Sequence, residues 1–291
     1  MNPIEHIASR ATQLGEGMIV HRALPTRQRR MVGAWCFLDH AGPVNFAEGD
    51  AMRVGAHPHT GLQTFTWLIE GEILHRDSLG NEQIIRPGEV NLMTAGHGIV
   101  HTEDSVPGKR LQAAQLWIAL PSTAAECPPS FEHFPDLPTW EQDACHWTLL
   151  AGSYGDKTAP AAFHSPLVGM DIRSLQKTMI TLRLSPGFEY GILPMEGECH
   201  IGQEKFITDE FAYLGTNLSQ VTLVLESGSR ILLLGGEPFE QPITMWWNFV
   251  GFSKEYIAQA QKDWENNTPR FGAVKDAESR RLTAPKLPWT T

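Results

Sequence analysis

Two pairs of candidate metal ligands constrain this chain more than any other feature of its sequence. His57 and His59 stand two residues apart, and so do His101 and Glu103. Side chains at positions i and i+2 of a β-strand point to the same face. Two such strands side by side would direct three imidazoles and one carboxylate at a common point, a ligand set that suits a divalent transition metal. The spacing therefore predicts one metal site on two adjacent β-strands.

Short apolar stretches separated by Gly and Pro run through the first 240 residues, for example VGAWCFLDH and LQTFTWLIEG. This pattern predicts an all-β chain of antiparallel barrels or sandwiches. One helix is expected near the C-terminus, where Ser253 can cap SKEYIAQAQKDWENN and apolar residues recur at helical spacing. We expect this short helix to pack on a barrel. The last twenty residues, from Gly272, are expected to form a surface strap or a frayed tail.

The chain divides into two halves that resemble each other weakly. A Pro-rich stretch at 121–138 predicts a connector between two domains, residues 1–138 and 139–291. The segment LIEGE at 68–72 recurs as PMEGE at 194–198, which indicates an internal repeat. At this offset the second half carries no counterpart of the ligands, because His57 falls on Arg183 and His59 on Ser185. One metal ion per chain is predicted.

Composition excludes several classes of function. The 291 residues carry a formal net charge of −10, which argues against direct binding to nucleic acid. The sequence contains no run of about 18 apolar residues, so no membrane helix is expected, and the N-terminal stretch lacks the apolar segment of a secretory signal. The four cysteines lie far apart without CxxC spacing, so we expect reduced thiols and a cytoplasmic protein. They are Cys36, Cys127, Cys145 and Cys199.

Residues around the ligand pairs give weaker signals. Alternation continued from His57 places Phe65 and Trp67 on the ligand-bearing face, where they would wall a pocket. His97 lies between two glycines and is interpreted as a loop residue or as a proton carrier at the mouth of the site. His75 follows a turn, and we expect it at the surface. A histidine that is simply buried in the core is the alternative for each ligand, but two such pairs seldom arise from packing alone.

Four segments carry a resemblance to a known family. HPHTGLQTFTWLIEG at 57–71 and RPGEVNLMTAGHGIVHTE at 86–103 closely resemble the pirin family of the cupin superfamily, and so do FLDHAGP at 37–43 and PITMWWNFVGFSKEYI at 242–257. The resemblance implies a bicupin, with two tandem cupin-type antiparallel β-barrels. It also implies one mononuclear metal site, usually iron, in the N-terminal barrel, with ligands at the matching His57, His59, His101 and Glu103.

One position departs from the family pattern. Many pirins carry Glu four residues after the second histidine, whereas this chain has Gln63. That position is not one of the four ligands, so the resemblance still implies a complete site. A neutral amide at Gln63 removes one candidate hydrogen-bond acceptor near the metal.

The resemblance and the ligand set together suggest two classes of function. The ligands suit Fe, Mn, Co, Ni, Cu or Zn, and the resemblance favours iron as Fe2+ or Fe3+. Some pirins are similar to quercetin 2,3-dioxygenases, oxidoreductases that open a flavonol ring; Glu103 would then be the catalytic base. The substrate would be a flavonol or another phenol or enol. The alternative is a redox-sensitive, metal-dependent regulator that binds protein partners and is not an enzyme.

Overall fold

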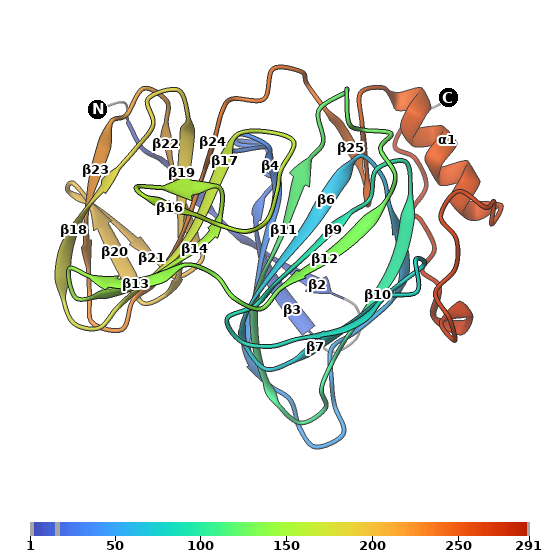
Figure 1. Ribbon diagram of the computed structural model, residues 1–291, viewed down its shortest axis with the longest axis horizontal. Coiled ribbons are helices and arrows are strands. Elements are labelled where there is room, and N and C mark those ends of the chain that lie inside the picture. The colour runs from blue at the N-terminus through green and yellow to red at the C-terminus, as the bar shows by residue number, and fades with distance from the viewer. Residues whose placement is uncertain (1–2, 15–17, 290–291) are drawn as a thin grey trace. The chain divides into compact units, whose positions relative to one another are not determined.

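A computed structural model describes residues 3–14 and 18–289 of the chain (Figure 1). The residues group into two compact units. The first unit comprises residues 12–20, 41–135 and 240–291, and the second comprises residues 1–11, 21–40 and 136–239. The expected domains, 1–138 and 139–291, follow the order of the chain. Packing groups the segments differently, because residues 240–291 return to the unit that contains the predicted ligands.

Two antiparallel sheets carry the predicted ligands and the strands around them (Figure 1). The larger sheet has the order β12 (Ser130–Phe134), β9 (Val90–Thr94), β6 (Leu62–Glu70), β11 (Arg110–Ala119), β4 (Trp35–Asn45), β3 (Met18–Leu24) and β2 (Arg10–Leu14). The smaller sheet has the order β5 (Arg53–His59), β10 (Ile99–Ser105), β7 (Ile73–Asp77) and β8 (Glu82–Ile85). Leu68 and Leu111 of the larger sheet and Val54 and Ile73 of the smaller one share a single core, so the sheets face each other.

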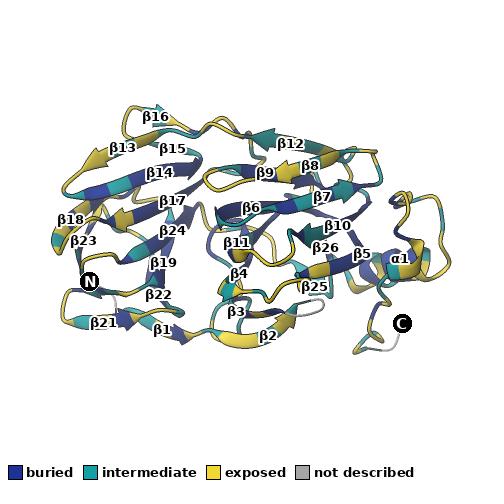
Figure 2. Ribbon diagram, turned by 90° about the horizontal axis from the view of Figure 1, so that it is seen from below, coloured by how far each residue is buried: buried dark blue, intermediate teal, exposed yellow. Residues whose placement is uncertain are grey.

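The second unit repeats this pattern. Its larger sheet has the order β1 (Glu5–Ala8), β22 (Glu210–Gly215), β19 (Glu189–Glu196), β24 (Arg230–Gly236), β17 (Leu167–Ser174), β14 (Cys145–Ala151) and β13 (Thr139–Gln142). Its smaller sheet has the order β18 (Thr178–Arg183), β23 (Gln220–Leu225), β20 (Glu198–Ile201) and β21 (Glu204–Ile207), and β15 (Ser153–Tyr154) pairs with β16 (Lys157–Thr158). In Figure 2 the inner strand β14 is mostly dark blue, whereas the edge strand β13 beside it carries yellow.

The internal repeat predicted from the sequence is confirmed by the strand order. β6 lies between β9 and β11, and β19 lies between β22 and β24 in the same way. The segments 68–72 and 194–198 end these two equivalent strands. The all-β, two-cupin fold class is confirmed, with one difference in detail. Among the described residues the sheets of a unit stay separate, so each unit is a sandwich and not a closed barrel.

The helix and the C-terminal segment pack on the first unit. Helix α1 (Lys254–Glu265) begins at Ser253, whose Oγ accepts the Tyr256 N–H at 3.1 Å, as the capping signal predicts. Its apolar stripe packs against the short hairpin of β25 (Thr244–Trp246) and β26 (Phe249–Gly251). After a 3-10 turn, η1 (Glu278–Arg280), the chain crosses β5, where the Leu282 N–H donates to the Ala56 carbonyl at 2.8 Å.

The segment expected to be a strap is anchored to the first unit at several residues. Val274, Ala277 and Ala284 are buried, and the Arg280 guanidinium donates to both oxygens of Asp104 at 2.7 and 2.9 Å. The last two residues of the predicted tail lie outside the described residues. No described helix is both long and apolar enough to cross a bilayer. All four cysteines are unpaired, which confirms the expected free thiols.

Candidate metal centre

Strands β5 and β10 lie side by side and bring the two predicted ligand pairs together. They pair antiparallel, with His101 opposite His57 and Ile99 opposite His59. Pro58 donates no hydrogen bond, and it is tolerated because β5 is an edge strand of its sheet. His57, His59 and His101 consequently project from neighbouring strands toward one point. The three histidines thus lie together as the i, i+2 spacing predicts, while their role as metal ligands stays a prediction.

The three imidazoles form a tight cluster. One ring nitrogen of each lies within 4.8 Å of a ring nitrogen of the other two. The Nε2 atoms of His59 and His101 are 3.1 Å apart. The ring centroids of His57 are 5.0 and 4.3 Å from those of His59 and His101. Two nitrogens bound to one ion at about 2.1 Å and at a right angle are separated by about 3 Å, so the His59–His101 spacing fits a shared metal ion.

Burial keeps the cluster in the form that binds metal. All three side chains are almost fully buried. Desolvation lowers the pKa of His57 to about 4, partly offset by its hydrogen bond to the Gly55 carbonyl. Burial and the neighbouring histidines hold the pKa values of His59 and His101 well below the usual range. Neutral imidazole carries the lone pair that a metal requires.

Glu103, the predicted fourth ligand, lies near the cluster but outside its tightest part. It follows His101 on the same face of β10, opposite His75 of β7. Burial raises the pKa of the Glu103 carboxyl, while His75 and the Thr66 hydroxyl act in the opposite direction. Among the described residues, the 4.8 Å cluster comprises the histidines and does not include Glu103. The ligand role of Glu103 stays a prediction.

The comparisons with known proteins agree with this geometry. A family model described as Pirin matches residues 17–118, and one described as Pirin C-terminal cupin domain matches residues 169–272. A protein of Pseudomonas aeruginosa with the provisional name quercetin 2,3-dioxygenase is 54% identical over 287 residues, which are 98% of this chain and 91% of the relative. The chain belongs to the pirin family.

Two further relatives resemble this pirin, one in sequence and one also in its solved structure. A pirin-like protein from Caulobacter vibrioides is 37% identical over 265 residues, covering 84% of this chain and 88% of the relative. The crystal structure of quercetin 2,3-dioxygenase from Acinetobacter baumannii is 48% identical in sequence. It superimposes with a TM-score of 0.96 and covers 99% of this chain and 97% of that one. This pirin therefore shares its whole bicupin architecture, and its three-histidine candidate metal site lies within a fold shared with these relatives.

In strand β6 the side chains that point to the interior are not the ones that the sequence prediction placed there. Thr66 and Leu68 of β6 face the interior: Thr66 lies beside Glu103, and Leu68 packs in the core with Val54. Phe65 and Trp67 are also buried but lie on the other face of β6. The prediction that they wall the metal site is wrong. The alternation is interrupted at Gly61 (φ +67°), where the chain leaves the sheet of β5 and enters that of β6.

The same interruption settles the position of Gln63. Its Nε2 donates to the Thr94 hydroxyl at 2.9 Å, on the face of β6 shared with Phe65 and directed away from the histidines. The aromatic side chain that does reach the cluster is Trp117 of β11, whose ring meets that of His59 edge to face at 5.1 Å. His97 is half-buried in its loop, where the Arg270 Nε donates to its carbonyl at 2.8 Å.

His75 is the residue that sequence reasoning missed. It was expected at the surface, but it is buried and stands beside His101, with 3.4 Å between the two Nδ1 atoms. Its Nε2 lies 3.1 Å from Oδ2 of Asp77. The signal was present in the sequence, because His75 and Asp77 also stand at i and i+2. The strand that carries them pairs with β10, and this pairing was not predicted.

The equivalent place in the second unit is filled with apolar side chains. Leu182 of β18 stands opposite Val221 of β23, and both belong to the core, as does Leu184. The inward positions are therefore Leu182 and Leu184. They come one residue before Arg183 and Ser185, which the sequence repeat aligned with His57 and His59 and which are exposed. A second group, Glu198, His200 and Glu226, lies half-exposed in this unit. Its carboxylates already pair with Lys205 and Lys177.

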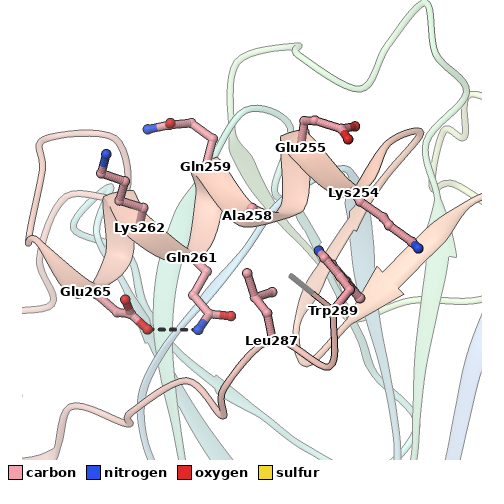
Figure 3. A pocket seen from close by; sticks show the side chains of 9 residues that line it. All are labelled: Lys254, Glu255, Ala258, Gln259, Gln261, Lys262, Glu265, Leu287 and Trp289. Atoms are coloured by element: carbon pink, nitrogen blue, oxygen red, sulfur yellow. Dashed lines mark hydrogen bonds between the residues drawn. The ribbon is translucent and has the colours of Figure 1, made fainter. Parts of the chain in front are cut away.

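A groove beside helix α1 is separate from the histidine cluster (Figure 3). It has a volume of about 490 Å³ and is lined by helix residues together with Leu287 and Trp289. Figure 3 shows the Gln261 amide directed at Glu265, with 2.8 Å between Nε2 and Oε1. None of the histidines of the cluster lines this groove.

Proposed function

We propose that this pirin is an iron-dependent dioxygenase that opens the ring of a flavonol or of a similar enol or phenol. The observation that carries the proposal is the convergence of His57, His59 and His101, three buried neutral imidazoles with the spacing of ligands on one ion. The names of the similar Pseudomonas and Acinetobacter proteins support the choice of substrate class. Iron is our choice among metals that this donor set suits.

The residues of the chain divide the work between them. The three histidines would hold the ion, with Glu103 as the proposed fourth ligand. A bound divalent ion would lower the pKa of the substrate hydroxyl and so favour the enolate. Glu103, two residues beyond His101 on the same face, would accept the released proton when it is partly freed from the ion. Trp117, against His59, supplies an apolar wall that limits water.

The reaction consumes one dioxygen for each flavonol and releases carbon monoxide, so no external reductant is required. A cytoplasmic location is part of the proposal, because four unpaired cysteines suit a reducing compartment.

The test is to add quercetin under air to iron-loaded protein of measured metal content and to follow the loss of flavonol absorbance together with carbon monoxide release. We expect turnover in the parent protein and none in His101→Ala, which loses the ion. Glu103→Gln should lower turnover more than it lowers metal content. His40→Phe, in the second unit, is the control and should retain activity. Iron-loaded parent protein that leaves the flavonol and a panel of other enols intact would contradict the proposal.

A further inference from the structure

Each histidine of the cluster has a different neighbour on its outer side. The Nδ1 of His57 lies 2.7 Å from the Gly55 carbonyl, and the Asn248 backbone stands beside His59 at less favourable geometry. His101 instead faces a side chain, since its Nδ1 lies 3.4 Å from Nδ1 of His75. Of the outer hydrogen-bond neighbours that the structure describes for the three histidines, the one beside His101 is a side chain.

The positions of the protons follow from the acceptors. Asp77 accepts hydrogen bonds from the Leu79 and Asn81 backbone amides at 2.9 and 3.1 Å and from the Asn81 side-chain amide. Asp77 acts as the acceptor in each of these bonds, so the Nε2–H of His75, with Nε2 3.1 Å from Oδ2, donates to Asp77 in the same way.

The tautomer of His75 then determines that of His101. A neutral His75 protonated at Nε2 presents a lone pair at Nδ1. The Nδ1–H of His101 can donate to this lone pair, which leaves the His101 Nε2 free on the side where it faces His59. Phe131 stacks on the His75 ring at 4.3 Å between centroids, with 13° between planes, and fixes the orientation of that ring.

We infer that His75, anchored by Asp77, is a positioning residue that sets the tautomer and direction of His101 as a metal ligand. The inference rests on the metal site of the proposed function. It assigns a task to a buried His–Asp pair that touches the cluster from the adjacent strand β7. Outer partners of this kind raise metal affinity by about 10- to 100-fold.

The experiment compares Co2+ binding by the metal-free protein and three variants, using competition with a chelator and the visible absorption of the bound ion. His75→Phe keeps a flat ring on Phe131 but removes the acceptor, and it should weaken binding by about 10- to 100-fold. His75→Gln can offer an amide oxygen and should recover part of the loss. His40→Phe is the matched control: His40 is equally buried and pairs with Asp209 at 2.7 Å, in the other unit.

A second measurement separates positioning from general destabilisation. In Co2+-loaded protein the Nδ1 proton of His101 should give a shifted, slowly exchanging NMR signal, which His75→Phe abolishes and His40→Phe retains. Equal affinity and an unchanged signal in His75→Phe would overturn the inference while leaving the metal site intact. So would an equal loss of affinity in His40→Phe. Failure of the parent protein to bind Co2+ would instead contradict the metal site itself, and the inference with it.

Discussion

At the scale of the residue, burial decides the ionisation state of the groups that this molecule uses and of those it keeps inert. Desolvation lowers the pKa values of His57, His59 and His101 and so keeps them neutral. The same effect raises the pKa values of buried cysteines, which therefore also stay neutral. Burial raises the pKa of Cys145 to about 11 and that of Cys199 to about 12. Neutral imidazoles bind metal, whereas protonated thiols neither bind metal nor react.

Thiol reactivity should therefore differ sharply between sites. In native protein, Cys127, which is partly exposed, should react with a disulfide reagent well before the three buried thiols. Those three should react only after unfolding, because they are inaccessible and, at Cys145 and Cys199, are less ionised at neutral pH. Thiol counting before and after denaturation measures this. Cys127→Ser should remove the fast phase, and rapid labelling of Cys145 or Cys199 in the folded protein would contradict the account.

The clustering of the three histidines was predictable from the sequence, and their outer neighbour His75 was not. His57, His59 and His101 are encoded by local spacing, because period-two alternation holds within a single strand. His75 reaches His101 only through the pairing of β7 with β10, which are separated in sequence by β8 and β9. A single sequence does not specify which strands pair, so His75 looked like an isolated surface histidine.

At the scale of the element, the turn at Gly61 separates β5, which carries His57 and His59, from β6. Gly61 has φ +67°, and a Cβ there would lie 2.2 Å from the Val250 carbonyl oxygen. This turn is also where extrapolation from the sequence failed. The alternation that correctly placed His57 and His59 was carried through it to Phe65 and Trp67, although the chain changes sheets there. A glycine signals such a turn but does not state its effect on the face.

Gly61→Ala should destabilise the fold by at least about 2 kcal/mol, because it combines a strained left-handed backbone with a steric clash. Gly80 provides the matched control, since it has φ +88° and no atom within 4 Å of an added Cβ. Gly80→Ala should cost only the backbone term, about 1 kcal/mol. Urea unfolding of both variants provides the comparison. Equal losses at the two positions would show that the close approach to Val250 is unimportant.

The cap of helix α1 gives a second prediction at this scale. Ser253→Ala removes the acceptor for the Tyr256 N–H and should destabilise the helix by about 1 kcal/mol. Hydrogen exchange at the first turn of α1 should accelerate accordingly. Ser253→Asp should preserve the protection, because Asp is an equally good N-cap residue and its negative charge interacts favourably with the N-terminal end of the helix dipole. Unchanged exchange in Ser253→Ala would mean that packing on β26 alone holds this turn.

At the scale of the whole molecule, one fold occurs twice, and within the described residues the buried three-histidine cluster lies in one of the two copies. The repeat was detectable in the sequence from LIEGE and PMEGE. The all-β class followed from the spacing of the strands, and the two-cupin fold followed from the resemblance to pirins. The packing of residues 240–291 on the first unit could not be predicted from the sequence. Which of two similar sandwiches a helix packs on depends on how their side chains fit together. Leu182, Leu184 and Val221 fill the second copy with the apolar residues of an ordinary core.

Metal should stabilise the molecule by mass action, since the ion binds the native state in preference to the unfolded one. The Tm of metal-free protein should rise with added Fe2+ under anaerobic conditions, or with Co2+ or Zn2+. At a free metal concentration about 100 times the Kd the gain is about 2.7 kcal/mol. His57→Ala should show no such rise. A Tm that is indifferent to metal in the parent protein would contradict binding at the cluster.

The most direct test of the account is the metal content of the purified protein, measured by elemental analysis for each chain. We predict about one ion per chain in the parent protein and in the double variant Glu198→Gln/His200→Gln, and close to none in His59→Ala. Two ions per chain, loss of the ion from the double variant, or retention of it by His59→Ala would contradict the claim that His57, His59 and His101 together hold a single metal.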